Sequence, residues 1–432
     1  ARSRSKSLFA SLLLAGGRLG DIYGRRRLFM IGLGIFTAAS LAAGLAGSAD
    51  VLIASRAVQG LGAALVTPTT LAIISAAYPE PRERTAAVGI WSAVGALALA
   101  VGPLLGGLIS QHLDWGWIFF INVPVGLATM ALGRWSIDPE TANANAERRR
   151  IDMPGLVTSA LALFALTFAL IEGHDKGWTS TLILGSFTLS ALLGVVFVAL
   201  ELRTDEPMVD VALFAERVFS GGVIAIVMWG FGLFGIYFFT SLYLQNVLGF
   251  SPTKAGAAFV PMALLMATSA VVSERVARAS GAHRAVGGAM LLMAIGIASV
   301  SLLGRDASFI SLMPSFALIG IGGGLSVPLT AMILDSMPTE RAGVASGIFN
   351  AAREMAGLLG ITVIGAILTA RQSGSINAGH APLDAFLSGY RTGLLVAAVL
   401  VAAGGVAAFI ALRSAPRHRT QPDTAVDFAL AG

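Results

Sequence analysis

Apolar stretches long enough to cross a lipid bilayer recur along the chain and are separated by short polar segments. A spanning helix needs about 20 apolar residues, because the hydrocarbon core is about 30 Å thick and a helix rises about 1.5 Å per residue. Twelve stretches meet this length, and each predicts one spanning helix. They cover residues 28–47, 51–73, 86–110, 115–134, 153–171, 181–201, 219–244, 255–274, 285–304, 308–334, 343–370 and 392–412. A shorter apolar stretch, residues 8–15, predicts only a partial helix near the N-terminus.

The composition of the 432-residue chain indicates a membrane protein rather than a soluble one. Hydrophobic residues make up 56% of the chain and charged residues only 12%. A soluble domain carries about 25% charged residues. Too few polar side chains remain to cover the surface of a soluble enzyme of this size. The predicted fold class is therefore an all-α polytopic membrane protein.

Two features argue against an enzyme and against a bound metal or cofactor. The chain has no cysteine, which excludes disulfides, thiol catalysis and thiolate metal sites. Its five histidines are scattered, without the spacing of a metal site or of a nucleophile and its base, and no phosphate-binding loop is present. We therefore expect neither catalysis nor a cofactor nor a metal.

Lysines and arginines fall mainly in alternate loops. Nineteen of the 29 lie on one side of the predicted helices and five lie on the other. Cytoplasmic loops of membrane proteins carry such an excess, so we expect the Arg-rich loops and the C-terminus in the cytoplasm of a bacterial plasma membrane. This distribution accounts for the net charge of +5 without nucleic-acid binding. The Arg-rich side carries Arg18, Arg25, Arg26, Arg27, Arg82, Arg84, Arg134, Arg148, Arg149, Arg150, Arg203, Arg217, Arg275, Arg278, Arg284, Arg341, Arg413, Arg417 and Arg419.

An internal repeat relates the two ends of the chain. The segment 60–70 matches the segment 320–330 in its glycines, its proline and its final threonine. Gly24 and Arg27 match Gly281 and Arg284 at nearly the same separation, and residues 89–90 match 347–348. Three matches in the same order predict two related halves, and repeated halves around a central site are typical of transporters.

Polar breaks divide the chain into four parts. The longest polar loop on the Arg-rich side runs from Asp138 to Asp152, and a second break runs from Arg203 to Arg217. We therefore expect an N-terminal bundle over residues 1–137, a linker loop with two inserted helices over 138–213, a C-terminal bundle over 214–412, and a cytoplasmic tail over 413–432.

A glycine-rich, arginine-rich loop precedes the first full span. Its glycines allow a tight reversal between helices, and its one acid can pair with an arginine or face the start of a helix in the other half. Two interpretations remain open: a cytoplasmic latch that breaks when the halves move, and a basic turn that only sets the orientation. The candidate residues are Gly17, Gly20, Asp21, Gly24, Arg25 and Arg26.

A few charged side chains fall within predicted spans, where charge is costly. Arg56 lies about five residues into its span, close to Gln59. Arg353 and Glu354 lie about ten residues into the span 343–370, and Glu354 is the acid placed most clearly at membrane depth. Intramembrane charges often serve function. Arg353 and Glu354 therefore form either a structural pair or a proton or cation site.

Two spans carry further candidate features. In the span 86–110, Gly102 and Gly106 form a GxxxG face around Pro103, which predicts close packing against a neighbouring helix. In the span 219–244, an aromatic run can either line a pocket for flat lipophilic cations or face lipid and core. The pocket candidates are Trp229, Phe234, Tyr237, Phe238 and, from a later span, Asn350.

Several of these segments resemble motifs of the major facilitator superfamily. The loop 17–27 resembles the signature between its helices 2 and 3, and residues 52–64 resemble its helix 4 motif. Gly89 with residues 102–107 resembles the helix 5 motif of its antiporters. Residues 115–126 resemble the opening of helix 6 in the 14-helix drug:proton antiporter branch.

The resemblance covers nearly all of residues 8–412, and the inserted pair of helices fits the 14-helix branch. It implies that Arg56 helps proton transfer by favouring the ionised form of a nearby acid, with Gln59 as a packing partner. It also implies that the helix 5 residues mark the export direction; these are Gly89, Gly102, Pro103, Gly106 and Gly107. Helix 1, which carries an intramembrane aspartate in the family, and most of helix 2 are missing from this sequence.

The sequence therefore predicts a proton-driven exporter of hydrophobic or cationic drugs or secondary metabolites. We expect it to work as a monomer by alternating access, with an amphipathic small molecule, protons and the bilayer as its partners. Two alternatives remain open. One is a truncated remnant that does not transport, and the other is an exporter or flippase of a lipid or siderophore on the same fold.

Overall fold

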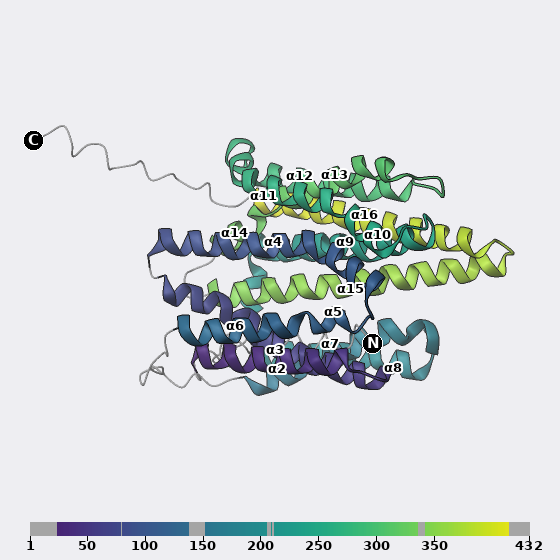
Figure 1. Ribbon diagram of the computed structural model, residues 1–432. Helices are drawn as coiled ribbons and strands as arrows, with labels where there is room; N and C mark the ends of the chain where they lie inside the picture. Colours follow the sequence, from purple (N-terminus) through teal and green to yellow (C-terminus); the bar gives the residue numbers. More distant parts are fainter. Residues whose placement is uncertain are drawn as a thin grey trace, which may run out of the picture.

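The computed structural model describes residues 24–78, 80–137, 152–204, 209, 211–335 and 342–413. All regular structure in these residues is helical (Figure 1). The helices are α2 (Arg25–Gly44), α3 (Ala49–Ala77), α4 (Pro81–His112), α5 (Trp117–Phe120), α6 (Asn122–Ser136), α7 (Met153–Lys176), α8 (Thr181–Glu201), η1 (Val211–Ala215), α9 (Arg217–Asn246), α10 (Pro252–Ala258), α11 (Val260–Ser280), α12 (Ala282–Ser301), α13 (Phe309–Leu325), α14 (Pro328–Asp335), α15 (Ala342–Asn377) and α16 (Pro382–Leu412).

The predicted spans correspond closely to these helices. Within the described residues, eleven helical stretches are long and apolar enough to cross a membrane, and the remaining prediction, 86–110, falls inside the 32-residue helix α4. Three spans are divided into two helices each: α5 with α6, α10 with α11, and α13 with α14. In the last two pairs the second helix begins at or next to a proline, Pro261 in α11 and Pro328 in α14. Proline lacks the N–H of a continuous helix, which accounts for these two divisions.

The helix that contains the last predicted span begins earlier than the span itself. The apolar stretch 392–412 is the inner part of α16, which begins ten residues earlier at Pro382. Hydropathy measures only the apolar part of a helix. A helix that continues into the polar headgroup region is therefore longer than its apolar stretch.

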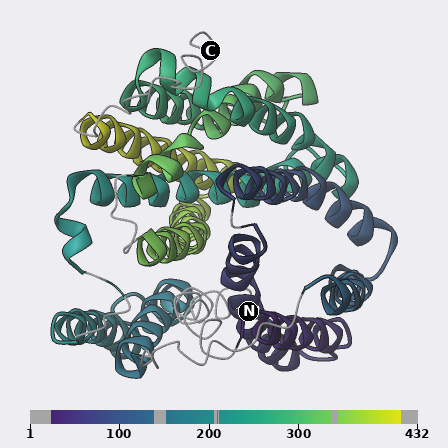
Figure 2. The ribbon, with the colours of Figure 1, turned by 90° about the vertical axis from the view of Figure 1, so that its left-hand side faces the viewer.

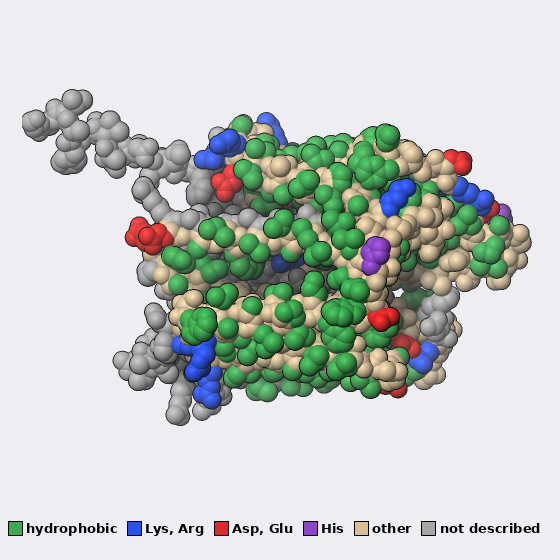
Figure 3. All heavy atoms as spheres, viewed as in Figure 1, with side chains coloured by type: hydrophobic (Ala, Val, Ile, Leu, Met, Phe, Trp, Pro, Cys, Tyr) green, Lys and Arg blue, Asp and Glu red, His purple; other side chains and the backbone are tan. Residues whose placement is uncertain are grey.

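The outer surface of the helices is apolar, as contact with lipid requires. Figure 3 shows hydrophobic side chains spread across the middle of the molecule, with charged groups gathered toward its two ends. On α8, for example, Leu192 is 59% exposed and Val195 is 67% exposed. We call the end that carries Arg25, Arg134 and Arg284 the Arg-rich end, and the other end the opposite end.

Helices α9–α16 pack around one shared core. This core includes the fully buried side chains of Phe219, Phe316 and Tyr390. Figure 2, which looks along the helices, shows these helices (teal to yellow) on one side of the molecule. Helices α2, α3 and α6 lie on the other side, and α7 with α8 form a separate pair that contacts α15 through α7. Helix α4 contacts both α10 and α11.

The internal repeat is present in the packing of the helices. A methyl group added to Gly62 of α3 would lie 2.7 Å from the carbonyl oxygen of Gly32 and 2.5 Å from the nitrogen of Phe36, both in α2. A methyl group added to Gly322 of α13 would lie 2.5 Å from the carbonyl oxygen of Ala289 and 2.6 Å from the nitrogen of Met293, both in α12. The repeat therefore pairs the same backbone atoms in both halves.

The repeated glycines before α2 and α12 also share one backbone conformation. Gly24 caps α2 with φ of 88°, and Gly281 caps α12 with φ of 82°. Side-chain-bearing residues rarely adopt this left-handed region, so glycine is required at both turns. This requirement explains why glycine stands at this turn in both halves.

Candidate functional site

The glycine-rich loop is described only from Gly24 onward. Arg25 and Arg26 form the first turn of α2, and Arg26 Nη2 donates a 2.7 Å hydrogen bond to the carbonyl oxygen of Arg134 at the end of α6. This bond joins two helices at the Arg-rich end. Gly17, Gly20 and Asp21 lie outside the described residues, and so does the predicted latch.

A polar network surrounds Arg56 inside the group of α2, α3 and α6. Arg56 Nη1 donates a hydrogen bond to Gln59 Oε1 one turn along α3. Gln59 Nε2 donates to Ser40 Oγ of α2 at 2.6 Å, and Asn122 Nδ2 of α6 donates to the same oxygen at 3.0 Å. Gln59 is 2% exposed and Ser40 is fully buried. Three helices therefore share one chain of hydrogen bonds that ends on a guanidinium group.

An aromatic ring also contacts the Arg56 guanidinium. Its central carbon lies 5.5 Å from the centre of the Phe119 ring in α5. A cation over a ring face is stabilised where water is scarce. Arg56 lies about 10 Å along α3 from Ala49, by helix rise, so these contacts hold the charge inside the helix bundle and not at its end. The predicted proximity of Arg56 and Gln59 is confirmed.

The glycines of α4 differ in their described contacts. A methyl group added to Gly102 or Gly106 would meet nothing within 4 Å among the described residues, so the predicted GxxxG packing face stays a prediction. The adjacent glycine, Gly107, makes the close contact instead. Successive residues of a helix point about 100° apart, so a change of one residue selects a different neighbour. Gly89 lies outside the side chains that the structure describes.

Helices α4 and α10 cross through a reciprocal contact near the opposite end. A methyl group on Gly107 would lie 2.8 Å from the carbonyl carbon of Pro252, and one on Gly256 would lie 2.7 Å from that of Pro103. Each helix thus places a glycine against the proline carbonyl of the other. The backbone nitrogen of Thr253 also donates to Gln111 Oε1 at 3.2 Å. This crossing joins the N-terminal helices to the C-terminal ones.

The charged pair of α15 is described only in part. Arg353 is half-buried, and its carbonyl oxygen lies 3.3 Å from a methyl group that would be added to Gly230 of α9. The helix therefore packs closely on α9 at this level. The side chains of Glu354 and Asn350 lie outside the described residues, so their predicted roles stay predictions.

The aromatic run of α9 serves packing in large part. Phe234 lies against Gly357 of α15, where an added methyl group would lie 2.8 Å from the ring. Tyr237 contacts Phe259 with ring centres 4.9 Å apart, and Phe259 stacks on Phe316 at 5.4 Å. Phe238 contacts Phe239 edge-on at 5.0 Å. Stacked and edge-on rings at these distances stabilise a core.

Two polar atoms of the same aromatic run are not accounted for by this packing. Trp229 Nε1 and Tyr237 Oη are buried and make no hydrogen bond within the described part of the chain. Eight residues separate them, so they lie about 12 Å apart along α9 and on similar faces. Buried donors are nearly always paired, so both atoms are candidates to bind a ligand or water.

The sequence reasoning missed Ser40, Asn122 and the α10 side of the helix crossing. Ser40 gives no sequence signal, because a single serine in an apolar helix commonly bonds to its own backbone. Asn122 lies inside the segment 115–126 that resembles a family motif, and nothing in the sequence assigns it a hydrogen bond of its own. A signal for the crossing did exist: Pro103 and Pro252 are each followed four residues later by glycine, at Gly107 and Gly256.

Comparison with known proteins agrees with this architecture. The family model of the Major Facilitator Superfamily matches residues 7–361. Multidrug resistance protein Stp of Mycobacterium tuberculosis is 35% identical over 369 residues, which cover 85% of this chain and 68% of that protein. Puromycin resistance protein pur8 of Streptomyces alboniger is 32% identical over 416 residues, which cover 94% of this chain and 82% of that protein. The tetracenomycin C resistance and export protein of Streptomyces glaucescens is 35% identical over 362 residues, covering 83% and 66%.

Solved structures share the fold at low sequence identity. A bacterial homolog of the human lysosomal transporter Spinster, in an inward-facing and unoccupied conformation, superposes with a TM-score of 0.62 at 17% identity, covering 95% of this chain and 90% of that one. A POT family transporter in complex with 5-aminolevulinic acid gives a TM-score of 0.65 at 14% identity, covering 92% and 85%. With its apolar helices, its repeated glycine contacts and these matches, the chain is a multi-pass membrane protein that belongs to the Major Facilitator Superfamily.

Proposed function

We propose that the chain exports amphipathic drugs or secondary metabolites in exchange for protons, by alternating access of two bundles over residues 1–137 and 214–412. Residues 138–213 would link the bundles and add the inserted helices. Resistance and export proteins that align with most of the chain support this function. The structural observation that carries it is the reciprocal crossing of α4 and α10, which joins the bundles close to one end.

The proposed orientation places the Arg-rich end in the cytoplasm. The arginines at the starts of α2, α9 and α12 and at the end of α16 support this orientation. The α4–α10 crossing then lies at the outer end, so the path would be closed to the outside. Export requires this crossing to open and the Arg-rich end to close, as in the rocking of repeated bundles.

Proton coupling is assigned to the charges at membrane depth. The network of Arg56, Gln59, Ser40 and Asn122 holds a guanidinium in place, and an acid that approached it would be favoured in its ionised form. Glu354 is the proposed proton carrier, because it lies in the apolar helix α15.

Substrate recognition is assigned to α9. The donors of Trp229 and Tyr237, which have no hydrogen-bond partner among the described residues, can bind carbonyl or ether oxygens of a bound molecule, while the surrounding rings contact its flat apolar part. A site with a few polar groups in an aromatic surround is typical of pockets for amphipathic ligands. We propose no separate site for a metal or a cofactor.

Ethidium efflux from cells that express this chain tests the proposal. We expect efflux above that of cells with an empty vector, and its loss when a protonophore removes the proton gradient. Efflux that continues unchanged without the gradient would contradict antiport. Export of a labelled phospholipid without any efflux of ethidium or of other amphipathic cations would favour the lipid exporter instead.

Glu354→Gln tests the proton carrier within the same assay. The variant is expected to lose the pH dependence of efflux, because glutamine cannot bind and release a proton at this depth. Glu274→Gln is the matched control: its carboxylate is 76% exposed and pairs with Arg278 at the Arg-rich end. Equal pH profiles for both variants and the unaltered chain would remove Glu354 from the mechanism.

A further inference from the structure

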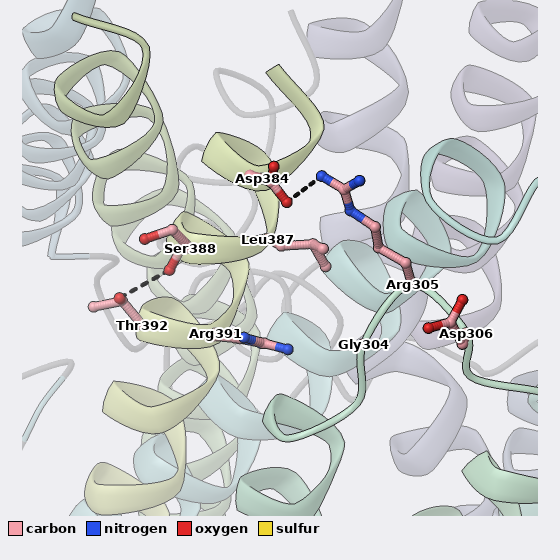
Figure 4. A pocket seen from close by; sticks show the side chains of 8 residues that line it. All are labelled: Gly304, Arg305, Asp306, Asp384, Leu387, Ser388, Arg391 and Thr392. Carbon is pink, nitrogen blue, oxygen red and sulfur yellow. Dashed lines mark hydrogen bonds and ion pairs between the residues drawn. The ribbon is translucent and has the colours of Figure 1, made fainter. Parts of the chain in front are cut away.

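A cavity of about 540 Å³ lies at the opposite end of the C-terminal helices, away from the α4–α10 crossing. One wall is the first three turns of α16, and the other is the loop between α12 and α13. Figure 4 shows Asp384, Ser388 and Arg391 on the α16 side and Arg305 with Asp306 on the loop side. None of the transport residues above lines it.

The charges around this cavity are only partly paired. Arg305 forms an ion pair with Asp384 across the cavity (Figure 4). Arg391 Nη2 donates a 3.3 Å hydrogen bond to the carbonyl oxygen of Leu303. Within the described residues, Arg391 forms no ion pair, so most of its guanidinium donors remain available to an anion.

The cavity wall is held in place by buried tyrosines. Tyr243 of α9 donates a 2.6 Å hydrogen bond to the carbonyl oxygen of Gly304, in the loop wall. Its ring stacks on Tyr390 of α16 with centres 5.0 Å apart. The loop and the helix that carries Arg391 are therefore fixed to the same support, and the cavity is preformed.

The height of Arg391 in the membrane corresponds to lipid headgroups. Helix α16 has 31 residues and is about 46 Å long, whereas the hydrocarbon core is about 30 Å thick. The apolar part begins directly after Arg391 and continues to Leu412. Arg391 therefore lies at the boundary of the core, and Asp384 lies about 10 Å farther into the polar region.

The exposed face of α16 joins the cavity to the lipid-facing surface. Exposed residues follow one another at helical spacing along a single face of α16: Asp384, Ser388 and Arg391, then Leu395, Val399, Val406 and Ile410. The first three are polar and the last four are apolar; Val399 is 67% exposed and Ile410 is 64% exposed. A free anion would contact only the polar part of this face. A phospholipid would contact the polar part with its headgroup and the apolar part with an acyl chain.

We propose that this cavity binds the phosphate headgroup of a phospholipid in the adjacent leaflet, which is the outer leaflet in the proposed orientation. Arg391 holds the phosphate through two N–H groups, and Ser388 lines the same cavity. One acyl chain follows Leu395 and Val399 along α16. This site is independent of transport and does not rest on the proposed substrate.

Native mass spectrometry of the purified full chain with phosphatidylglycerol tests the site. The unaltered chain is expected to retain one more lipid than Arg391→Gln, with the ratio of lipid-bound to lipid-free protein lower by about tenfold in the variant. Arg371→Gln, at an exposed arginine of α15 outside the cavity, is the matched control and should retain lipid like the unaltered chain. Ser388→Glu, which adds a negative charge beside Arg391 and leaves its bond to Leu303 intact, should lower retention like Arg391→Gln.

Two results would overturn the proposal. One is equal lipid retention by the unaltered chain, Arg391→Gln and Ser388→Glu. The other is a rise in melting temperature with inorganic phosphate alone, lost in Arg391→Gln, without any difference in lipid retention. That second result would identify a site for free anions.

Discussion

Gly106 and Gly107 are neighbours in α4, yet among the described residues only Gly107 contacts another helix closely. A methyl group on Gly107 would lie 3.0 Å from Thr253 Cα, whereas one on Gly106 would meet nothing within 4 Å among the described residues. Backbone atoms cannot move aside as a flexible side chain can. A methyl group added at these two positions should therefore have opposite effects on the stability of the protein.

We expect Gly107→Ala and Gly106→Ala to change the free energy of unfolding with opposite signs. Gly107→Ala should destabilise by about 1–3 kcal/mol, because its methyl group forces α4 and α10 apart. Gly106→Ala should stabilise by up to about 1 kcal/mol, because alanine restricts the unfolded chain more than glycine does. Thermal unfolding in detergent measures both. A loss of stability in both variants would show that the open space beside Gly106 is filled in the folded protein.

At the scale of elements, two kinds of contact hold the α12–α13 loop to its neighbours. The ion pair of Arg305 with Asp384 is on the surface, with side chains 44% and 51% exposed. The hydrogen bond from Tyr243 to Gly304 comes from a fully buried side chain. Water screens an exposed pair, whereas a hydrogen bond made by a fully buried side chain is shielded from water on the donor side.

Removal of the hydrogen bond from Tyr243 should therefore lower the free energy of unfolding more than removal of the ion pair does. Tyr243→Phe is expected to destabilise the protein by about 1–3 kcal/mol, and Asp384→Asn by less than about 1 kcal/mol. Chemical denaturation at two salt concentrations separates the two, since only the ion pair weakens with salt. The reverse order of the two effects would mean that the ion pair is shielded from solvent in the folded protein.

At the scale of the whole molecule, the atomic contacts between α4 and α10 involve residues 103–111 and 252–256. Alternating access requires that such a crossing open during each cycle. The chain has no cysteine, so a pair of introduced thiols can be cross-linked selectively.

We expect a cross-link between Gln111→Cys and Thr253→Cys to abolish efflux. The two residues share a hydrogen bond across the crossing, so a thiol-specific reagent with a short spacer should join them and hold the outer end closed. Efflux is measured before and after reaction, and again after reduction. Recovery on reduction would show that the block comes from the cross-link itself.

A second pair of thiols provides the control. Ser299 and Ser315 share a 2.9 Å hydrogen bond between α12 and α13, within one group of helices. Cross-linking Ser299→Cys to Ser315→Cys should leave efflux unchanged, because the two helices move together. Full efflux by the cross-linked Gln111 and Thr253 pair would rule out an opening of this crossing.

Particular residues show how far the sequence could predict the site. Arg56 and Gln59 lie one turn apart on one helix, so their contact follows from local geometry alone. Ser40 and Asn122 join them from two other helices, and helical spacing gives no information about such partners. Phe234 belongs to a run that the sequence assigns either to a substrate pocket or to lipid and core, and it packs on Gly357, because the rotation of α9 against α15 turns this ring toward the neighbouring helix.

The sequence by itself determined the membrane helices, the asymmetry of charge between their ends, and the repeat that relates Gly24 to Gly281. These properties depend on one segment at a time, since transfer of a helix into lipid and the φ angle of a turn are local quantities. The tertiary structure alone decided that Gly107 rather than Gly106 contacts α10, and that Ser40 joins the Arg56 network. It also decided that Arg391 lines a cavity next to the exposed apolar face of α16. Those outcomes depend on the rotation and partner of each helix. Apolar helices that are all stable in lipid select their partners by close packing and hydrogen bonds, which hydropathy does not encode.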